Sequence, residues 1–577
     1  MMTLFKVILR EVKEYKTASI LTPLFMVGEV LLEIMLPFLM SFIIDEGVSK
    51  GDMNAVFTYG AWMLVCAFAS LACGAIAGKL AAKASAGFAK NVRKSLFDKI
   101  QDFSFRNIDH FSTSSLITRM MSDVTNVQNS YQMVLRMCVR SPLNLICAMV
   151  MTFMINRKLA VVFLYAAIFL AVVLVLITKF TFPIFDDVFK RYDNVNASVQ
   201  ENITNIRVVK AYVKEEQETK KFKEASSMLY RLFKKAEHLL ILNGPSMQLS
   251  VYGCIIGISW LGAKMISQDL LTTGELMSML TYTMTILMSL MMLSMIFVML
   301  SMSLASVKRI VEVLEAKSDI VSPSQAVMEV KDGSIDFENV SFRYFLDKDD
   351  DNLSDINLHI EAGETIGILG GTGSGKTTLV QLLARLYDVT SGSVKIGGVD
   401  VRDYDLDVLR HEVSMVLQKN VLFSGTIIDN MHWGDENASL EEIQHVCKLA
   451  QADSFIQNFP AKYEHYIEQG GSNVSGGQRQ RLCIARALLR KPKVLILDDS
   501  TSAVDTRTDY LIRKAFREEL PGMTKLIISQ RISSIQDADR IIVMDDGKIV
   551  NIGTHDELLQ TSQIYQEVYE TQVKGEE

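Results

Sequence analysis

The sequence predicts a membrane domain of about six helical spans followed by a soluble α/β domain. Residues 1–305 contain long apolar runs, whereas residues 330–577 form a charged chain interrupted by glycines. The chain has 577 residues, which is longer than one ordinary domain of about 150 residues. The hydrophobic content of the whole chain is 49%, which is ordinary for a soluble protein. This average does not show the division, because an apolar half and a charged half contribute to it together. We therefore expect a membrane domain over residues 1–320 and a soluble domain over residues 321–577.

Composition argues against two classes of function. The net charge is −7 and no basic stretch is interleaved with aromatic residues, so we expect no nucleic-acid partner. The chain has 7 cysteines without a CxxC pair. Most of them lie in apolar segments, where cysteine behaves as a small hydrophobic residue. We therefore expect neither a disulfide framework nor a zinc site.

Several segments of the first half meet the length of a membrane span, which is about 20 mostly apolar residues. These segments are residues 18–43, 56–84, 131–155, 159–182, 240–266 and 275–302. Before the first of them, residues 3–16 place apolar and basic side chains on different helical faces. This pattern is typical of a helix lying at the membrane surface, with an ordinary cytoplasmic helix start as the alternative.

The connections between these spans predict the topology. Lysine and arginine concentrate in the N-terminus and in two long segments near residues 85–130 and 183–238. The positive-inside rule therefore places both termini and both long segments in the cytoplasm, and makes the chain a multi-pass protein of the cytoplasmic (inner) membrane. The tips near Ser114–Asp123 and Ile206–Lys214 are predicted to dock onto the soluble domain. The alternative is that they are solvated connectors.

Two features of the spans suggest a path for cargo. Glu29 and Glu33 lie one helical turn apart in the first span, where carboxylates are costly and usually face a cavity or a partner. In one interpretation, the two carboxylates attract cationic cargo or gate the path. In the other, they pair with a basic residue of another span and hold the bundle together. The last span is rich in methionine, which suits adaptable binding surfaces but is also ordinary filler in membrane helices. Its candidates for the path are Met288, Met292 and Met295.

A Pro/Ser linker at Val321–Gln325 precedes the soluble half, which carries a phosphate-binding loop. The segment ETIGILGGTGSGKTTLVQLLARL predicts a strand, a glycine loop and a helix, and its loop is Gly370–Thr377. The glycines let backbone N–H groups face phosphates, Lys376 neutralises phosphate charge, and the Thr377 hydroxyl can bind Mg²⁺. This loop by itself indicates a nucleotide, and would equally suit a kinase or a GTPase.

Three later segments narrow the function. Gln418 falls where a strand is predicted to end, in VLQKNVLFSGTI. The segment VSGGQRQR spans Val474–Arg481, and VLILDDSTSAVD spans Val494–Asp505. In the last of these, an apolar strand delivers Asp498 to the metal of a phosphate-loop site.

Together these motifs resemble the ABC transporter ATPase family, and nearly the whole chain resembles its exporter half-transporters. SGGQ at this distance after a phosphate loop, followed by ILDD and SAVD, is very specific to that family. QENITNIRVVKAYVKEEQ is similar to the second cytoplasmic loop of exporters. The resemblance implies a six-span exporter-type membrane domain fused to an α/β ABC ATPase domain, with ATP and Mg²⁺ as cofactors.

Roles for individual residues follow from the same resemblance. It implies that Tyr344 stacks on adenine, that Gln418 senses the γ-phosphate and the metal, and that Asp505 links two sites across a dimer. It places Mg²⁺ on Thr377, Gln418 and Asp498. The residues implied to bind nucleotide through the loop are Gly370, Gly371, Thr372, Gly373, Ser374, Gly375, Lys376, Thr377 and Thr378. The residues implied to cap a nucleotide held by the opposite subunit are Ser475, Gly476, Gly477 and Gln478.

Two positions depart from the family pattern. The residue after Asp498 is usually the glutamate that polarises the attacking water, and here it is Asp499, which is shorter by one methylene. A general base needs a reach of about 2.6–3.2 Å, so the shorter side chain predicts slow hydrolysis. Gln530 stands where the family usually has a histidine, and it can donate a hydrogen bond but carries no charge.

These departures predict a site that binds ATP and hydrolyses it poorly. They resemble the subunit with the degenerate ATP site in bacterial heterodimeric multidrug ABC exporters. We therefore expect a second half-transporter as partner, amphipathic small molecules as cargo, and a lipid bilayer as surroundings. The alternatives are a homodimer, an exporter of lipid or peptide, and an ATP-gated channel or regulator.

Overall fold

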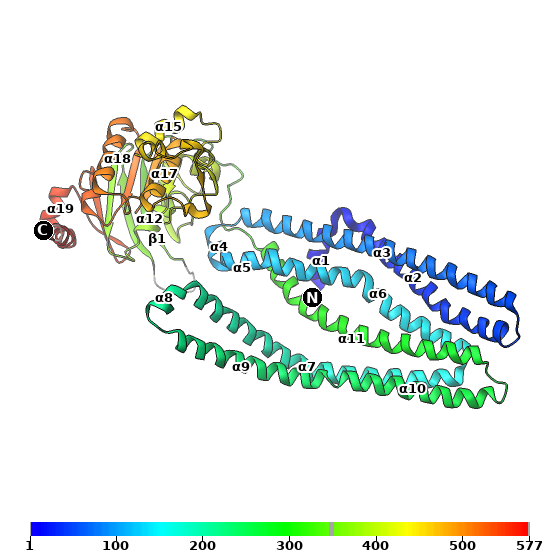
Figure 1. The fold of residues 1–577 in the computed structure, drawn as a ribbon. Helices are drawn as coiled ribbons and strands as arrows, with labels where there is room; N and C mark the ends of the chain where they lie inside the picture. The colour runs from blue at the N-terminus through cyan, green and yellow to red at the C-terminus, as the bar shows by residue number, and fades with distance from the viewer. Residues whose placement is uncertain (1, 345–350, 575–577) are drawn as a thin grey trace. The chain divides into compact units, whose positions relative to one another are not determined.

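The computed structural model describes residues 2–344 and 351–574, and its contacts divide the chain into two compact units (Figure 1). The helical unit comprises Met1–Gln101 and Thr113–Ala316, and the α/β unit comprises Asp102–Ser112 and Lys317–Glu577. Each unit is described by itself below.

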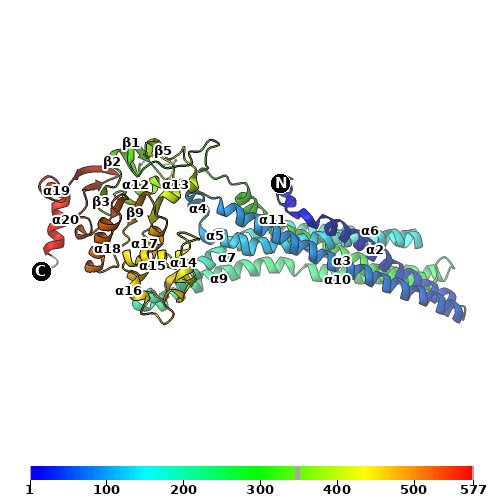
Figure 2. The ribbon, with the colours of Figure 1, turned by 90° about the horizontal axis from the view of Figure 1, so that it is seen from above.

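Long helices make up the helical unit. They are α1 (Met2–Leu9), α2 (Lys16–Phe42), α3 (Met53–Gln101), α5 (Thr113–Thr118), α6 (Val124–Ile155), α7 (Arg157–Thr204), α8 (Ile206–Ala211), α9 (Glu215–Leu240), α10 (Asn243–Ile266) and α11 (Thr273–Glu315). Short 3₁₀ or π segments adjoin them at Arg10–Tyr15, Ile43–Val48 and Arg119–Asp123. The hairpin of α7 and α9 lies side by side in both views (Figures 1 and 2).

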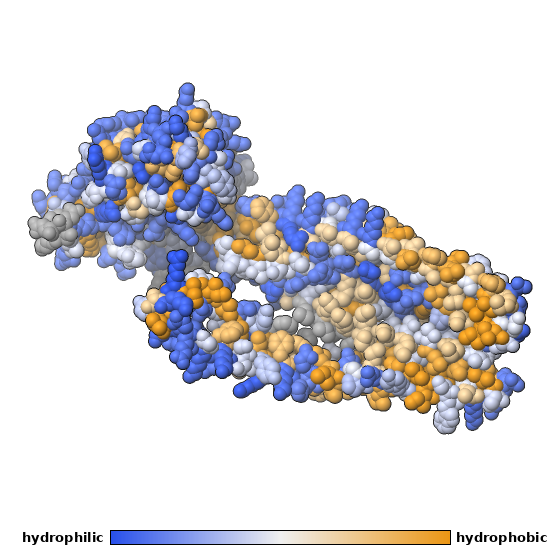
Figure 3. Space-filling model, in the orientation of Figure 1, coloured by the Kyte–Doolittle hydropathy of each residue, from blue (hydrophilic) through white to orange (hydrophobic). Residues whose placement is uncertain are grey.

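The prediction of six spans is confirmed by length and composition. Among the described residues, 6 helical stretches are long and apolar enough to cross a membrane. They are Lys6–Val48, Met53–Gln101, Thr113–Ile155, Arg157–Phe185, Glu215–Ile266 and Thr273–Leu293. Large apolar side chains are exposed along them, and Figure 3 shows such residues gathered on the helical unit. Exposed apolar area of this extent is expected where lipid covers the protein.

Helix caps explain why two of the turns between spans are so tight. Asn156 precedes α7, and its side chain accepts hydrogen bonds from the backbone of Lys158 and Leu159. Thr272 precedes α11 and forms a reciprocal capping box with Glu275. Both caps satisfy backbone N–H groups that the first helical turn leaves without a partner. The chain therefore reverses within a few residues at each point.

One buried hydroxyl of the span core finds its partner inside the bundle. Tyr282 of α11 is fully buried, and its hydroxyl donates to the backbone oxygen of Ile34 in α2 over 2.7 Å. Around this contact pack Val30, Phe163 and Ile258. An unpaired hydroxyl would be costly in a lipid-surrounded bundle, so this bond fixes the position of α11 against α2.

One segment of the first long hairpin, Asp102–Ser112, lies outside the helical unit. The helix α4 (Phe105–Phe111) belongs to the α/β unit, and Asn107 donates from its side chain to the backbone oxygen of Lys317 over 3.2 Å. Ser114–Asp123 stays in the helical unit, where Asp123 accepts from Arg309 Nε over 2.7 Å. Ser104 caps α4, and docking by Ser114–Asp123 and Ile206–Lys214 stays a prediction.

The described residues of the α/β unit form three sheets. Their strands are β1 (Ile335–Phe342), β2 (Leu353–Ile360), β3 (Thr365–Gly370), β4 (Ser391–Ile396), β5 (Val399–Asp400), β6 (Val413–Val416), β7 (Gly425–Thr426), β8 (Tyr466–Ile467), β9 (Val494–Asp498), β10 (Thr524–Ile528), β11 (Arg540–Asp545) and β12 (Lys548–Gly553). The strand orders are β2-β1-β4-β5, β12-β11-β3-β10-β9-β6 and β7-β8.

Helices cover these sheets. They are α12 (Lys376–Leu383), α13 (Leu406–Glu412), α14 (Ile427–Met431), α15 (Leu440–Leu449), α16 (Asp453–Ile456), α17 (Gly476–Leu489), α18 (Thr506–Glu519), α19 (His555–Thr561) and α20 (Gln563–Lys574). Single 3₁₀ turns occupy Lys462–Glu464, Gln469–Gly471 and Ile532–Ser534. Both ribbon views show α15 beside α17 (Figures 1 and 2).

The six-stranded sheet determines where a site forms. Strands β6, β9, β10, β3 and β11 are parallel, and β9 and β10 are buried along their whole length. Such continuous apolar runs are typical of parallel strands covered on both faces. The carboxyl ends of parallel strands meet at one edge, which is where open α/β sheets bind their ligands.

Candidate nucleotide site

The phosphate-binding loop joins β3 to α12, as predicted. Gly373 and Gly375 adopt φ of 85° and 92°, which glycine enters at no steric cost. A Cβ on Gly375 would lie 2.7 Å from Leu353 Cδ2, whereas a Cβ on Gly371 or Gly373 would meet nothing within 4 Å. The loop is therefore packed on its inner side and open on its outer side, which suits an anion held by backbone N–H groups.

Lys376 spans the same loop. Its Nζ donates to the backbone oxygens of Gly370 and Gly371 over 2.9 and 2.6 Å, and to Ser374 Oγ over 3.3 Å. Burial lowers the pKa of Lys376, and the carboxylates of Asp498 and Asp499 oppose this shift. The amine is thus held beside the open face of the loop, where a phosphate would need a positive charge.

Thr377 and Asp498 form a pair of oxygen ligands. The Thr377 hydroxyl donates to Asp498 Oδ1 over 3.0 Å, and Asp498 is only 2% exposed at the end of β9. Burial raises the pKa of Asp498, while the Thr377 hydrogen bond and the charge of Lys376 oppose the rise. A hydroxyl and a carboxylate fit Mg²⁺, which prefers oxygen ligands and takes the rest from phosphate and water. Such an ion would neutralise phosphate charge when bound.

Asp499 follows directly on β9 with a tightly held backbone. Its φ is 47°, its N–H donates to Ile528 O over 3.1 Å, and its carbonyl accepts from Ser502 Oγ over 3.0 Å. Burial raises the pKa of Asp499, and the charges of Arg531 and Lys376 oppose the rise. Both hydrogen bonds hold the Asp499 backbone in place relative to the phosphate loop. The length of the Asp499 side chain therefore decides how far its carboxylate reaches toward that loop.

The strand order places the two other predicted residues, Gln418 and Gln530, at the same edge of the sheet. Gln418 comes after β6 and is exposed, and Gln530 comes after β10 and is exposed. Because β6, β9, β10 and β3 are neighbours in that part of the sheet, these residues end at the same edge as Asp498 and the phosphate loop. The roles that the family resemblance implies for them stay predictions.

The SGGQ segment forms a second cluster with the SAVD segment. Ser475 caps α17 in a capping box with Gln478, and a Cβ on Gly477 would lie 2.8 Å from Ala503 O. Asp505 caps α18 by accepting from the backbone of Thr508 over 3.0 Å. Gly476 lies beside the same residue, because its Cβ would be 3.4 Å from Ala503 Cβ. The SGGQ segment at the start of α17 therefore packs against the SAVD segment that precedes α18.

Tyr344 has partners that sequence reasoning missed. Its hydroxyl lies 3.0 Å from Thr378 Oγ1 and donates to Gln381 Oε1 over 3.1 Å. Its ring meets that of Tyr387 edge-on, with the centroids 5.1 Å apart, and the Tyr387 hydroxyl donates to Asp109 of α4 over 2.7 Å. Asp109 and Tyr387 are far apart in sequence, so no local pattern could have linked them.

The acidic pair in the first span is joined to a basic residue of another span. Arg140 of α6 donates to Glu29 Oε1 over 2.8 Å and to Glu33 Oε2 over 2.9 Å. A Cβ on Gly74 would lie 3.0 Å from the Glu29 carboxyl carbon, so glycine leaves the room that Glu29 needs. Pairing that holds the bundle was one of the two predicted alternatives, and a role in the cargo path stays a prediction.

Changing Arg140 to methionine is expected to reduce the amount of folded protein in the membrane. Arg140 and Glu33 are partly exposed, so the cost falls below the about 3–5 kcal/mol of a fully buried pair. Most of it comes from the Glu29 carboxylate, which is 11% exposed and would be left uncompensated. The measurement is the yield of monodisperse protein on size-exclusion chromatography. Changing Glu29 and Glu33 to glutamine in the same chain should restore the yield. An unchanged yield for Arg140→Met alone would contradict a structural role for the pair.

The methionines of the last span lie on its surface. Met288, Met292 and Met295 are all exposed on α11, with 56%, 38% and 59% of their area accessible. An exposed face of flexible, polarizable side chains suits both cargo and a second bundle. These residues stay candidates for the path.

The fold and the site define a P-loop ATPase carried by a multi-pass membrane domain. Residues 19–328 match the family of the ABC transporter transmembrane region, and residues 353–502 match the ABC transporter family. The chain is 38% identical over 560 residues to the ABC transporter ATP-binding protein YfiB of Bacillus subtilis, covering 97% of each chain. The protein belongs to the ABC transporter family.

Two further similarities describe its relatives. An ATP-dependent lipid A-core flippase of Desulfotalea psychrophila is 32% identical over 484 residues, covering 84% of each chain. A bacterial Atm1-family ABC exporter solved with ATP bound has a TM-score of 0.83 and 24% identity, with 97% of this chain and 99% of that chain covered. The fold is therefore that of an ABC exporter half-transporter, with one membrane domain and one ATPase domain.

Proposed function

We propose that this chain is one subunit of a heterodimeric ABC exporter that moves amphipathic small molecules out of the cytoplasm. Its own site binds ATP with Mg²⁺ and hydrolyses it slowly, whereas the partner subunit supplies a competent site. The observation that carries this proposal is Asp499 at the position of the catalytic glutamate, together with Gln530 at the position of the histidine. Both termini and the ATPase domain face the cytoplasm in this arrangement.

The held backbone of Asp499 supports slow hydrolysis. A shorter side chain could be compensated if the backbone moved toward the phosphate loop by the length of one methylene. The bonds to Ile528 O and Ser502 Oγ oppose that movement, because both join Asp499 to neighbouring parts of the sheet edge. A positioned acid–base group contributes about 10²–10⁴-fold to a rate, and a loss within this range is expected here.

A second subunit is supported by the number of spans and by the intact SGGQ segment. This chain has 6 candidate spans among its described residues, and the family encloses its path with about twice as many. Ser475 and Asp505 are exposed at helix starts, where they are accessible to an opposite subunit. The same chain can therefore hold a slow site and complete a fast one.

The relatives favour lipid as a second class of cargo. One relative is named a lipid A-core flippase, and a fatty acid ABC transporter of Mycobacterium bovis is 31% identical over 474 residues, covering 82% of this chain and 75% of its own. Drugs and lipids share an amphipathic character, so the two proposals are separated by measurement. Stimulation of ATP turnover by lipid extracts but not by amphipathic drugs would favour a lipid exporter.

Changing Asp499 to asparagine is expected to alter ATP turnover of the co-produced two-subunit transporter by less than about twofold, because the slow site contributes little of the total. Changing the matching glutamate of the partner to glutamine should abolish turnover. Phosphate release from purified complexes in nanodiscs measures both. If Asp499→Asn abolished turnover as well, Asp499 would be a working base and a homodimer with two equal sites would be favoured.

A further inference from the structure

The loop that carries Gln530 is hydrogen-bonded to α20, the last helix of the described chain. Gln572 of α20 donates from Nε2 to Gln530 O over 2.7 Å, and its Oε1 accepts from the N–H of Ile532 over 2.9 Å. A single side-chain amide thus satisfies a backbone acceptor and a backbone donor on either side of Arg531. These two bonds fix the backbone from which the Gln530 side chain extends.

The same loop is tied to the segment before Asp505. Arg531 donates from Nη1 to Val504 O over 3.1 Å and from Nη2 to Ser502 O over 2.9 Å. Hydrogen bonds from a charged group are stronger than those between neutral groups. The position of Gln530 is therefore coupled to the segment that the family resemblance places at the dimer interface.

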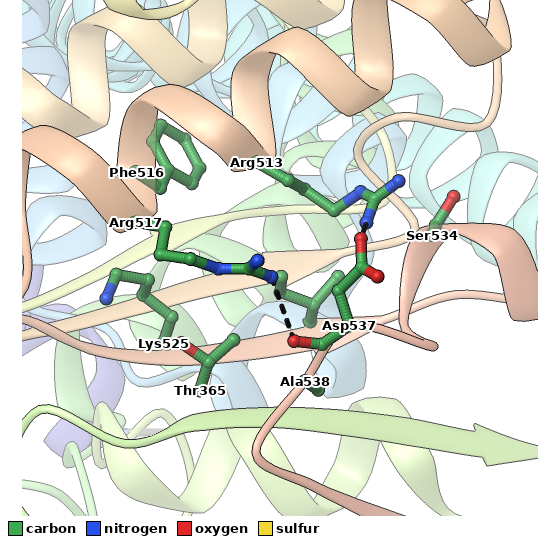
Figure 4. A pocket seen from close by; sticks show the side chains of 9 residues that line it. Thr365, Arg513, Phe516, Arg517, Lys525, Ser534, Asp537 and Ala538 are labelled. Carbon is green, nitrogen blue, oxygen red and sulfur yellow. Dashed lines mark hydrogen bonds and ion pairs between the residues drawn. The ribbon is translucent and has the colours of Figure 1, made fainter. Parts of the chain in front are cut away.

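The other end of the loop that carries Gln530 lies at Asp537 and is held by different residues. Figure 4 shows Arg513 and Arg517 of α18 reaching Asp537 beside a small pocket. Arg513 Nη1 lies 2.5 Å from Asp537 Oδ2, and Arg517 donates to Asp537 O over 3.0 Å. Asp537 holds the far end against α18, whereas Gln572 and Arg531 hold the near end together with Ser529, whose Oγ accepts from Arg531 N over 3.0 Å.

Helix α20 is itself firmly seated. Tyr565 is fully buried in the core, and its hydroxyl lies 2.7 Å from His555 Nδ1 of α19. Tyr569 follows one turn later, and its ring meets that of His555 edge-on at 5.5 Å. Gln572 lies seven positions after Tyr565, on the same helical face. The packed face of α20 thus sets the place of the Gln572 amide.

We propose that Gln572 is a positioning residue for Gln530, through which the C-terminal helix aims the Gln530 side chain at the terminal phosphate of a bound nucleoside triphosphate. The inference rests on the proposed function, in which Gln530 stands where the family usually has a histidine, at the sheet edge that carries the phosphate loop. The group recognised is the γ-phosphate, which ADP lacks. Gln572 therefore contributes to the preference of this site for ATP over ADP.

The test compares Gln572→Met with Gln563→Met in the full-length chain. Gln563 lies on the same helix but is exposed and bonds only to Glu567 among the contacts described, over 2.9 Å. An azido-ATP analogue labels the site, and ATP or ADP displaces it. We expect Gln572→Met to reduce the preference for ATP about three- to tenfold without weakening ADP, the range that one neutral hydrogen bond contributes. Gln563→Met should change neither affinity.

The variant Gln530→Ala distinguishes a failure of the positioning role of Gln572 from a failure of the role given to Gln530. If Gln530→Ala lowers the ATP preference and Gln572→Met adds nothing in that background, Gln572 acts through Gln530. An unchanged preference in Gln530→Ala would show that Gln530 does not contact the terminal phosphate and would overturn the inference. The slow-site proposal would still be decided by the turnover of Asp499→Asn. A normal preference in Gln572→Met alone, or equal weakening of ATP and ADP, would overturn the positioning role while leaving the proposed function standing.

Discussion

Changing Asp499 to glutamate and Gln530 to histidine together is expected to raise ATP hydrolysis at this chain's own site by about 10²-fold or more. Glutamate extends the carboxylate by one methylene, and the backbone at this position is held by Ile528 O and Ser502 Oγ, so the added length is directed outward. Histidine restores a side chain that can carry positive charge beside phosphate. The measurement is ATP turnover of the two-subunit transporter whose partner site has lost its catalytic glutamate.

The matched control is Asp355→Glu. Asp355 has φ of 49°, close to the 47° of Asp499, so the control adds the same methylene at the same left-handed backbone conformation. It lies in β2, outside the edge that carries Asp498, and should leave turnover unchanged. If the double change at positions 499 and 530 also left turnover unchanged, side-chain length would not be what limits hydrolysis.

Changing Ser475 to alanine is expected to lower the ATP turnover of the assembled transporter by about 10²-fold, although Asp499→Asn in the same chain barely alters it. In the proposed dimer the Ser475 hydroxyl and the start of α17 complete the partner's competent site. Losing a hydrogen bond to a charged phosphate costs about 1.5–3 kcal/mol, and misplacement of the helix start adds to this loss. Phosphate release from the purified complex measures the effect.

Ser439→Ala provides the control for helix stability. Ser439 caps α15 in the same type of capping box that Ser475 forms for α17. Either change removes a cap worth about 1 kcal/mol, so both should lower the unfolding temperature similarly. Only Ser475→Ala should lower turnover by about 10²-fold. Equal activity of the two variants would show that this chain's SGGQ segment does not serve the fast site.

Local chemistry in the sequence was enough to predict both halves of the fold. The spans were recognisable because a lipid-covered helix needs a long apolar run, and the phosphate loop because glycine, lysine and threonine must follow in that order. The slow site was also a prediction from the sequence, since the identity of residues 499 and 530 is a local property. The structure adds two hydrogen bonds that hold the backbone at Asp499, and these bonds support that prediction.

Sequence patterns alone determined the class of protein, the phosphate loop, the carboxylate that is predicted to bind a metal, and the two unusual positions. The tertiary structure decided which distant residues meet. Arg140 pairs with Glu29 and Glu33 across spans, Asp102–Ser112 packs with the α/β unit, and Gln572 grips the backbone at Gln530. The physical reason is that local periodicity follows from neighbouring residues, whereas these pairings depend on helix packing and chain reversal far along the sequence.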